Sequence, residues 1–230
     1  MATATYLARR GQLETYFDRT AAAAWARLTS DAPVSGIRAT VRAGRDRMRA
    51  TLLAWMPDDL HGTRLLDAGC GTGALAVEAA QRGAEVVAID LSPTLVGVAR
   101  DRMPAGLRID WRSGDMTDPA LGRFDYVVGM DSLIHYRAPD MARVAAQLAA
   151  LADKKVLFTF APRTPLLSLM HAAGKLFPRG DRAPAIEPVR HVIISSLLRA
   201  DPAMAGWRRV RTVRIASGFY TSQALELVRQ

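Results

Sequence analysis

A glycine-rich stretch, residues 65–80 with the sequence LLDAGCGTGALAVEAA, constrains this chain more than any other feature. Two leucines end a short apolar run, an aspartate follows, and three spaced glycines precede a helical pattern. This order predicts a strand, a tight turn and a helix. Glycine adopts positive φ and has no Cβ, so a ligand can approach the backbone closely, and the first N–H groups of the helix face that ligand. The stretch therefore predicts a binding site for a phosphate or a nucleoside.

Two interpretations of this turn are possible, a dinucleotide-binding site and an S-adenosylmethionine-binding site. Gly69, Gly71 and Ala74 satisfy the G-x-G-x-x-G/A pattern of dinucleotide sites. Asp67 and the additional Gly73 give D-x-G-x-G-x-G, which resembles the first motif of the Rossmann-like S-adenosylmethionine methyltransferases. An acidic residue before the first glycine suits a sulfonium cofactor that carries an ammonium group, and it suits a pyrophosphate poorly. The pattern favours S-adenosylmethionine over a nicotinamide cofactor.

Composition sets broad limits. With 230 residues, one domain with a substantial core is expected. No apolar run reaches the ~18 residues of a membrane span, and the N-terminus lacks the apolar region of a signal peptide. The single Cys70 excludes an internal disulfide and fits a cytoplasmic location. The net charge of +9 allows an anionic partner such as nucleic acid, a lipid surface or an acidic small substrate, without choosing among them.

The middle of the chain alternates between strand and helix patterns. Strands are expected at 63–67, 85–90, 107–112, 124–130 and 155–160, with helices at 73–82, 92–103 and 139–152. Such alternation implies right-handed crossovers and a parallel sheet. Strand-like runs at 207–216 and 219–228 are joined by a short turn and should form an antiparallel hairpin. The predicted fold class is α/β, a Rossmann-like methyltransferase fold with a seven-stranded, mostly parallel sheet.

Two segments lie outside this core. Residues 1–56 should form N-terminal helices, including a strong one at 36–55, that act as a lid or substrate arm. Residues 57–230 would form the methyltransferase domain. Within it, residues 161–188 contain five prolines around an apolar helix at 166–177, and we interpret this insertion as a second part of the substrate lid. A helix at 189–200 should follow.

Carboxylates follow the second and third strands. Asp90 lies 21 residues after Gly69, where a carboxylate can accept both ribose hydroxyls of a nucleoside. Its neighbour Leu91 resembles the methyltransferase residue that packs on the adenine. In methyltransferases of this type an acidic residue after the third strand accepts from the adenine amino group. Asp115 with Met116 occupies that place, and Asp118 is the alternative.

The segment Met130–Tyr136 follows the fourth strand, at the edge where open α/β sheets bind ligands. Met130 is assigned to the cofactor site. The segment lacks the Asn/Asp-Pro-Pro-aromatic signature of methyltransferases that modify an amide or exocyclic amine, so it favours an oxygen or carbon acceptor. His135 is the histidine best placed for the reaction pocket. The sequence shows no Ser-His-Asp set, zinc-ligand spacing or P-loop lysine.

Taken together, the motifs resemble the magnesium-protoporphyrin IX O-methyltransferases of chlorophyll and bacteriochlorophyll synthesis. Four stretches carry the resemblance: Tyr16-Phe17 with Trp25, Val41–Arg45, the insertion from Ala161–Pro165 to Leu176–Pro178, and Phe219–Ser222 with Leu225-Glu226. The chain departs from the family in its Ala-rich N-terminal helix and in Arg45, where a histidine is expected.

The resemblance implies transfer of a methyl group from S-adenosylmethionine to one propionate of magnesium-protoporphyrin IX. A propionate has a pKa near the glutamate reference of about 4.3 and is ionised at pH 7, so the reaction needs no strong base. Tyr16 and His135 resemble the family's catalytic pair and are interpreted as donors that orient the carboxylate. Arg42 would contact the cofactor carboxylate from the lid side. The remaining candidate substrate contacts are Arg163, Leu166, Met170 and Phe177.

The magnesium belongs to the substrate, so no metal site in the protein is expected. The resemblance suggests a transient contact with a magnesium chelatase subunit, and at most a peripheral contact with the photosynthetic membrane. Three alternatives stay open: an O- or C-methyltransferase acting on a quinone-type acceptor, a basic RNA-binding protein that keeps the cofactor fold, and a nicotinamide oxidoreductase. Because no RNA-binding module or interleaved aromatic and basic patch is present, we expect no nucleic-acid partner.

Overall fold

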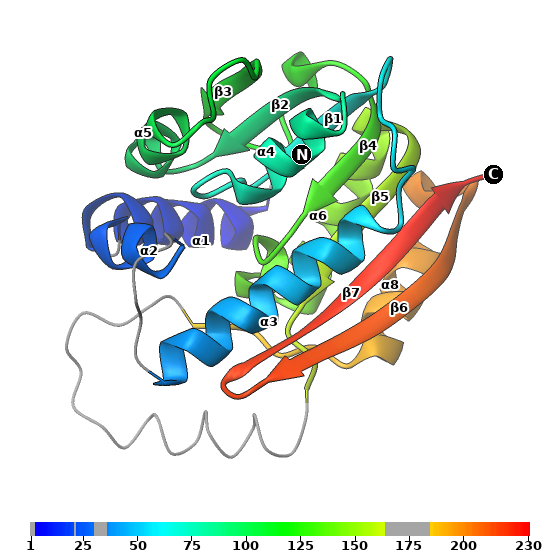
Figure 1. Ribbon diagram of the computed structural model, residues 1–230. Coiled ribbons are helices and arrows are strands. Elements are labelled where there is room, and N and C mark those ends of the chain that lie inside the picture. Colours follow the sequence, from blue (N-terminus) through cyan, green and yellow to red (C-terminus); the bar gives the residue numbers. More distant parts are fainter. Residues whose placement is uncertain (1–2, 21, 30–35, 164–184) are drawn as a thin grey trace, which may run out of the picture.

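A seven-stranded sheet forms the centre of the molecule (Figure 1). The computed structural model describes residues 3–20, 22–29, 36–163 and 185–230. The strand order is β3-β2-β1-β4-β5-β7-β6. The first five strands in this order pair in parallel, and β7 pairs antiparallel with both β5 and β6. The strands are β1 (Arg64–Ala68), β2 (Glu85–Asp90), β3 (Ile109–Ser113), β4 (Phe124–Gly129), β5 (Ala152–Phe160), β6 (Trp207–Ser217) and β7 (Tyr220–Arg229).

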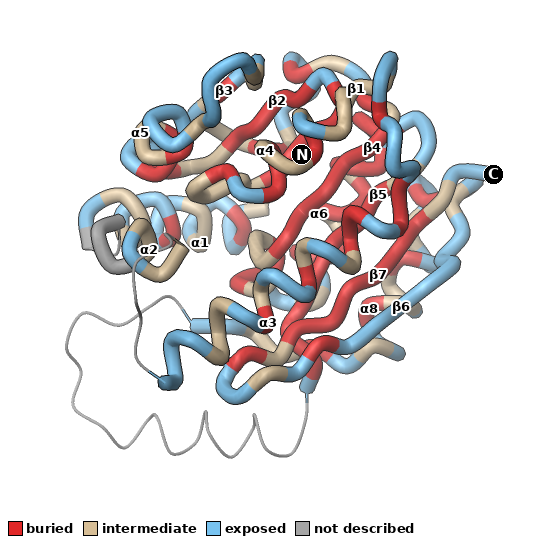
Figure 2. The backbone as a smooth tube through the Cα atoms, viewed as in Figure 1, coloured by how far each residue is buried: buried red, intermediate tan, exposed pale blue. Residues whose placement is uncertain are grey.

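Helices cover both faces of the sheet and define two apolar cores. One core contains residues of α3 (Gly36–Leu53), α4 (Ala74–Gln81) and α5 (Pro93–Asp101), and the other contains α6 (Ala138–Leu151) and α8 (His191–Ala200). Neighbouring strand residues point to opposite cores, as Leu65 and Leu66 do. Both faces are therefore buried, and Figure 2 shows β4, β7 and the second half of β5 as almost continuously buried.

The predicted core elements are confirmed, with differences of up to three residues at their ends. β5 begins at Ala152, directly after α6, where the sequence predicted a strand from 155. α3 ends at Leu53, two residues before the predicted end, and the turn continues to Pro57. The predicted hairpin is present, with Gly218 and Phe219 between β6 and β7. The predicted helix at 166–177 lies outside the described residues.

The N-terminal segment folds over the carboxyl ends of the strands as α1 (Ala4–Thr15), the π-helical turn η1 (Tyr16–Thr20) and α2 (Ala22–Leu28). Figure 1 shows α1 and α2 near α5, while α3 runs beside β7. Tyr6 stacks on Tyr136 with ring centroids 5.2 Å apart, and the hydroxyls of Thr3 and Thr5 donate to Asp140. These contacts hold α1 against the start of α6.

Short 3₁₀ turns complete the chain at η2 (Pro119–Leu121), η3 (Leu133–His135) and η4 (Pro202–Met204). Among the helices in the described ranges, none combines the length and apolarity needed to cross a membrane.

Gly44 allows α3 to pack closely on β7. A Cβ at this position would lie 2.5 Å from Cδ1 of the Tyr220 ring, whereas a Cβ at the helical Gly97 would meet nothing within 4 Å. We expect Gly44→Ala to lower the free energy of unfolding by about 1–3 kcal/mol, because the ring must move. Gly97→Ala should instead raise it by about 0.5–1 kcal/mol through helix propensity. Urea denaturation measures the free energy of unfolding of both variants. Equal changes in the two would show that Gly44 is not required for the close packing of α3 on β7.

Candidate active site

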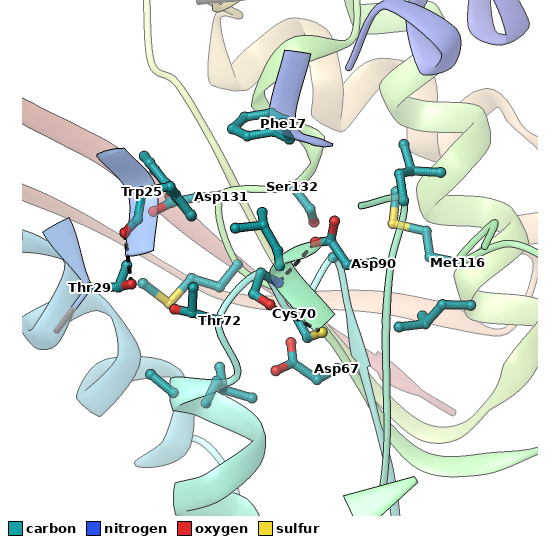
Figure 3. Close-up of a pocket in the computed structure, with 18 of the residues that line it drawn as sticks. Phe17, Trp25, Thr29, Asp67, Cys70, Thr72, Asp90, Met116, Asp131 and Ser132 are labelled. Carbon is teal, nitrogen blue, oxygen red and sulfur yellow. Dashed lines mark hydrogen bonds between the residues drawn. The ribbon is translucent and has the colours of Figure 1, made fainter. Parts of the chain in front are cut away.

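A cavity of about 340 Å³ lies at the carboxyl ends of β1, β2 and β4, beneath the N-terminal helices. Its walls come from α1, η1, α2 and α3 on one side, and from the glycine turn and the loop after β4 on the other. Figure 3 shows Asp67 and Asp90 on either side of the turn that carries Cys70. Nine of the predicted site residues line this cavity: Arg42, Asp67, Gly69, Gly71, Asp90, Leu91, Met116, Met130 and His135.

The glycine turn between β1 and α4 adopts the backbone that only glycine takes readily. Gly69 and Gly71 have φ values of 83° and 54°. A Cβ at Gly69 would lie 2.3 Å from Cβ of Ser132, so the loop after β4 packs directly on the turn. The amide N–H of Gly71 donates to the Asp90 carboxylate at 2.9 Å. The turn is thus tied to the end of β2 before any ligand binds.

Asp67 is a buried acid with unused hydrogen-bonding capacity. Its side-chain oxygen Oδ2 has no hydrogen-bond partner among the described residues. Burial, together with the nearby Asp90 charge, raises the pKa of Asp67 to about 7. A cationic group placed here would restore the charged carboxylate. The residue therefore fits the predicted role of holding the ammonium group of an S-adenosyl cofactor.

Asp90 ends β2 and is fixed by two backbone donors. Its two oxygens accept from the N–H groups of Gly71 at 2.9 Å and Ser92 at 3.0 Å. Burial raises its pKa, while these donors act in the opposite direction. Each oxygen keeps a second acceptor site, since a carboxylate oxygen has two lone pairs. This geometry fits the predicted acceptance of two ribose hydroxyls.

Two predicted cofactor residues are placed differently. Gly73 is not among the cavity-lining residues, and a Cβ there would lie 2.4 Å from the Trp111 ring. Asp115 also lies outside the lining and accepts from Tyr6 at 2.9 Å, Arg10 at 2.7 Å and both donors of Thr117. Three of these donors bond to Oδ1, whereas Oδ2 accepts only from Arg10 and keeps one acceptor site. Both cofactor contacts stay predictions.

His135 lies on the loop after β4, in the short turn η3. It is buried, lines the cavity, and packs edge-to-face on Phe17 with centroids 5.7 Å apart. Phe17 in turn packs edge-to-face on Tyr16 at 5.2 Å. Tyr16 itself does not line the cavity as the structure describes it. An aromatic contact through Phe17 therefore connects the two predicted catalytic residues.

None of the predicted substrate contacts is among the described residues that line the main cavity. Arg163 is exposed and lines a separate cavity of about 130 Å³ with Arg137 and Arg190. Leu166, Met170 and Phe177 lie outside the described residues. Cys70 lines the main cavity, but burial raises the pKa of its thiol, which disfavours a role as a nucleophile.

Several cavity residues were missed by the sequence analysis. They are Phe17, Trp25, Arg45, Asp131 and Ser132, all of which line the cavity. Asp131 had a usable signal, because it follows the end of a parallel strand where ligands bind. Trp25 and Arg45 belong to stretches that carry the family resemblance, but local patterns gave no sign of their position, since it depends on how the N-terminal helices fold back.

Comparison with known proteins decides the family. The model for "Magnesium-protoporphyrin IX methyltransferase C-terminus" matches residues 129–229, and a general methyltransferase domain matches residues 65–155. A magnesium-protoporphyrin O-methyltransferase from Rhodobacter capsulatus is 51% identical over 224 residues, covering 96% of this chain and 97% of the relative. The chain belongs to the magnesium-protoporphyrin O-methyltransferase family.

The family's structure agrees with this fold. Magnesium protoporphyrin IX methyltransferase from Synechocystis, solved with bound SAH, superposes with a TM-score of 0.84 at 29% identity, covering 96% of this chain and 100% of that one. Both the resemblance and the predicted fold class are confirmed. A ubiquinone biosynthesis O-methyltransferase from Xanthomonas oryzae is 39% identical, but the match covers only 53% of this chain and 55% of that relative. Membership of the magnesium-protoporphyrin family thus rests on the whole chain.

Proposed function

We propose that this chain transfers a methyl group from S-adenosylmethionine to a propionate carboxylate of magnesium-protoporphyrin IX. The products are the monomethyl ester and S-adenosylhomocysteine, a step of (bacterio)chlorophyll biosynthesis. The 51% identity that spans both chains almost completely carries the proposal. The cavity independently supports the cofactor half of this proposal. Two carboxylates flank its glycine turn: Asp67, which has an oxygen without a hydrogen-bond partner among the described residues, and Asp90, which is held by two backbone N–H groups.

The reaction needs no general base, because the propionate is already ionised at pH 7. S-adenosylmethionine, when bound, supplies the methyl group on a sulfonium centre. The propionate oxygen forms the new bond to the methyl carbon as the carbon–sulfur bond breaks, and no proton is transferred. The protein therefore has to orient two reactants and exclude water. Positioning of this kind can lower a barrier by ~7–11 kcal/mol.

The cavity geometry supports the roles proposed on the cofactor side. Asp67 would pair with the cofactor ammonium group and Asp90 with the ribose hydroxyls. Arg42, which lines the cavity and donates to the backbone carbonyls of Leu28 and Arg27, would contact the cofactor carboxylate. Leu91, Met116 and Met130 supply apolar surface for the adenine.

His135 and Tyr16 would act on the acceptor side by donating hydrogen bonds to the propionate. The buried position of His135 in the cavity wall supports its role. Tyr16 does not line the cavity as described, and its contact with the acceptor stays a prediction. Arg163, Leu166, Met170 and Phe177 stay predicted contacts to the macrocycle.

Tyr16→Phe tests the second donor. We expect kcat to fall about tenfold, because one hydrogen bond to a charged group is lost, with the dissociation constant of S-adenosylhomocysteine unchanged. Tyr126→Phe removes the same atom outside the cavity and should leave kcat unchanged. Steady-state kinetics at saturating porphyrin measure both variants, and wild-type turnover in Tyr16→Phe would remove Tyr16 from the mechanism.

The magnesium belongs to the acceptor in this account. A transient contact with a magnesium chelatase subunit, a cytoplasmic location and at most peripheral membrane contact stay predictions from the resemblance.

A quinone-type acceptor is the alternative function, and a panel of acceptors distinguishes the two. Purified protein is given S-adenosylmethionine with either magnesium-protoporphyrin IX or a catechol-type quinone precursor, and kcat/KM is measured for each. The proposal expects the porphyrin to be preferred by about 100-fold or more, since a pocket discriminates by several fitted contacts. Faster turnover of the catechol would favour the alternative, and salt-dependent RNA binding without turnover of either would favour an RNA-binding protein.

A further inference from the structure

The loop after β4 begins with a backbone conformation that is costly for most residues. Asp131 has a φ of 55°, the one positive value of a non-glycine residue in the described ranges. Aspartate tolerates this region better than larger residues, yet it is uncommon there. Such a residue persists when its surroundings hold it. Asp131 directly follows Met130 and precedes the turn that carries His135, so its conformation sets the course of this cavity wall.

Four side chains hold the Asp131 carboxylate. Arg45 donates at 2.6 Å and the Tyr220 hydroxyl lies 3.1 Å and 3.2 Å from the two oxygens. Thr159 and Ser222 complete the set at 3.2 Å and 3.3 Å. The donors come from α3, β5 and β7, and the Asp131 side chain is only 6% exposed. The family-like Val41–Arg45 and Phe219–Ser222 stretches therefore converge on one carboxylate.

Arg45 connects this carboxylate to the rest of the cavity wall. Its side chain is 19% exposed, and its guanidinium lies 4.8 Å from the centre of the Trp25 ring. Arg45, Asp131 and Trp25 all line the main cavity. The ion pair thus forms part of the wall that a bound molecule would contact.

The charge of Asp131 would conflict with an anionic acceptor. Besides the Arg45–Asp131 pair, the cavity lining contains three acids and two arginines: Asp46, Asp67, Asp90, Arg42 and Arg49. In a partly dehydrated cavity, a further uncompensated carboxylate repels another carboxylate strongly. Tyr220, Ser222 and Thr159 are neutral donors and cannot cancel the charge. Among the described side chains bonded to Asp131, Arg45 supplies the positive charge.

We propose that Arg45 and Asp131 form a specificity-determining pair, in which Arg45 neutralises the cavity wall so that it accepts a carboxylate-bearing substrate. Asp131 is a positioning residue that fixes the loop leading to His135. Arg45 compensates the negative charge of Asp131, so that this charge does not repel a propionate. This inference rests on the proposed function, because it assumes a carboxylate acceptor.

The test compares porphyrins with and without carboxylates. Binding of magnesium-protoporphyrin IX and of its dimethyl ester is titrated by fluorescence, with S-adenosylhomocysteine present, for wild type, Arg45→Met and the double variant R45M/D131N. In Arg45→Met, we expect the diacid to bind about tenfold more weakly and the dimethyl ester to bind unchanged. The double variant, which has lost both charges, should bind the diacid within about threefold of wild type.

Controls separate charge from structure. Arg211→Met also removes a partner of a buried carboxylate, Glu226, but outside the main cavity, and should leave the ratio of diacid to ester affinity unchanged. If Arg45→Met fails to fold, seen as loss of S-adenosylhomocysteine binding, Asp131→Asn alone should bind the diacid more tightly with the ester unaffected. Equal weakening of both porphyrins, or no weakening, would overturn the proposal. A wild-type protein that binds neither porphyrin would instead refute the proposed function together with this role.

Discussion

His135→Ala is expected to lower kcat by about 100-fold while S-adenosylhomocysteine binds within about threefold of wild type. Removing one preorganised donor from a dehydrated site has an effect of this size. His135 is buried in the cavity wall against Phe17, so its loss leaves the acceptor carboxylate without that orienting group. The cofactor side, formed by the glycine turn and Asp90, is held by its own hydrogen bonds and should be unaffected.

His61 offers a matched control for this change. Its side chain is 80% exposed, pairs with Asp59 and does not line the cavity. His61→Ala should keep both kcat and cofactor affinity. Single-turnover kinetics at saturating porphyrin, with calorimetry for S-adenosylhomocysteine, measure both variants. Wild-type turnover in His135→Ala would exclude His135 from the acceptor site.

Asp67→Asn should stabilise the free protein and weaken its cofactor binding. The pKa of this carboxyl is raised from 3.8 to about 7, so the folded state holds the proton more tightly than the unfolded chain. An acid with a raised pKa destabilises the fold increasingly as pH rises from 3.8 to 7, and by a constant amount above it. Replacing it by the neutral amide should therefore add about 4 kcal/mol at pH 8 and about 2 kcal/mol at pH 5.

The same substitution removes the charge that pairs with an ammonium group. We expect the dissociation constant of S-adenosylhomocysteine to rise by about 30-fold or more, as when one partner of a buried ion pair is lost. Asp59→Asn, at an exposed acid whose pKa is lowered, should give neither effect. Chemical denaturation at pH 5 and pH 8 gives the free energy of unfolding of both variants, and calorimetry gives their affinity for S-adenosylhomocysteine. Unchanged cofactor affinity in Asp67→Asn would contradict its assignment.

Local sequence patterns were enough to predict the cofactor side of the site, which is formed by residues close together in the sequence. Asp67, Gly69, Gly71 and Asp90 each lie at the end of a strand or in the turn that follows, and all four line the cavity. Periodicity and turn chemistry determine these positions over short distances. The same reasoning predicted Gly73, which does not line the cavity and lies close to Trp111, so its cofactor contact stays a prediction.

The acceptor-side wall depends on contacts between distant parts of the chain. Asp131 meets Arg45 across 86 residues and Tyr220 across 89. Neither pairing leaves a periodic pattern: the first depends on where α3 packs on the sheet, and the second on the place of β7 in the strand order. Asp115 illustrates the same limit, since its partners Tyr6 and Arg10 lie more than 100 residues away on α1. Only the folded chain brings these groups together.

Methyl transfer to the porphyrin carboxylate is the most direct test of the central claim. The purified protein is incubated with S-adenosylmethionine labelled in the methyl group and with magnesium-protoporphyrin IX, and the porphyrin product is isolated. We expect one label per porphyrin, released by mild alkali because it is held in an ester, and no transfer to the dimethyl ester. Absence of label on the porphyrin, or label that resists alkali, would contradict methyl transfer to the propionate.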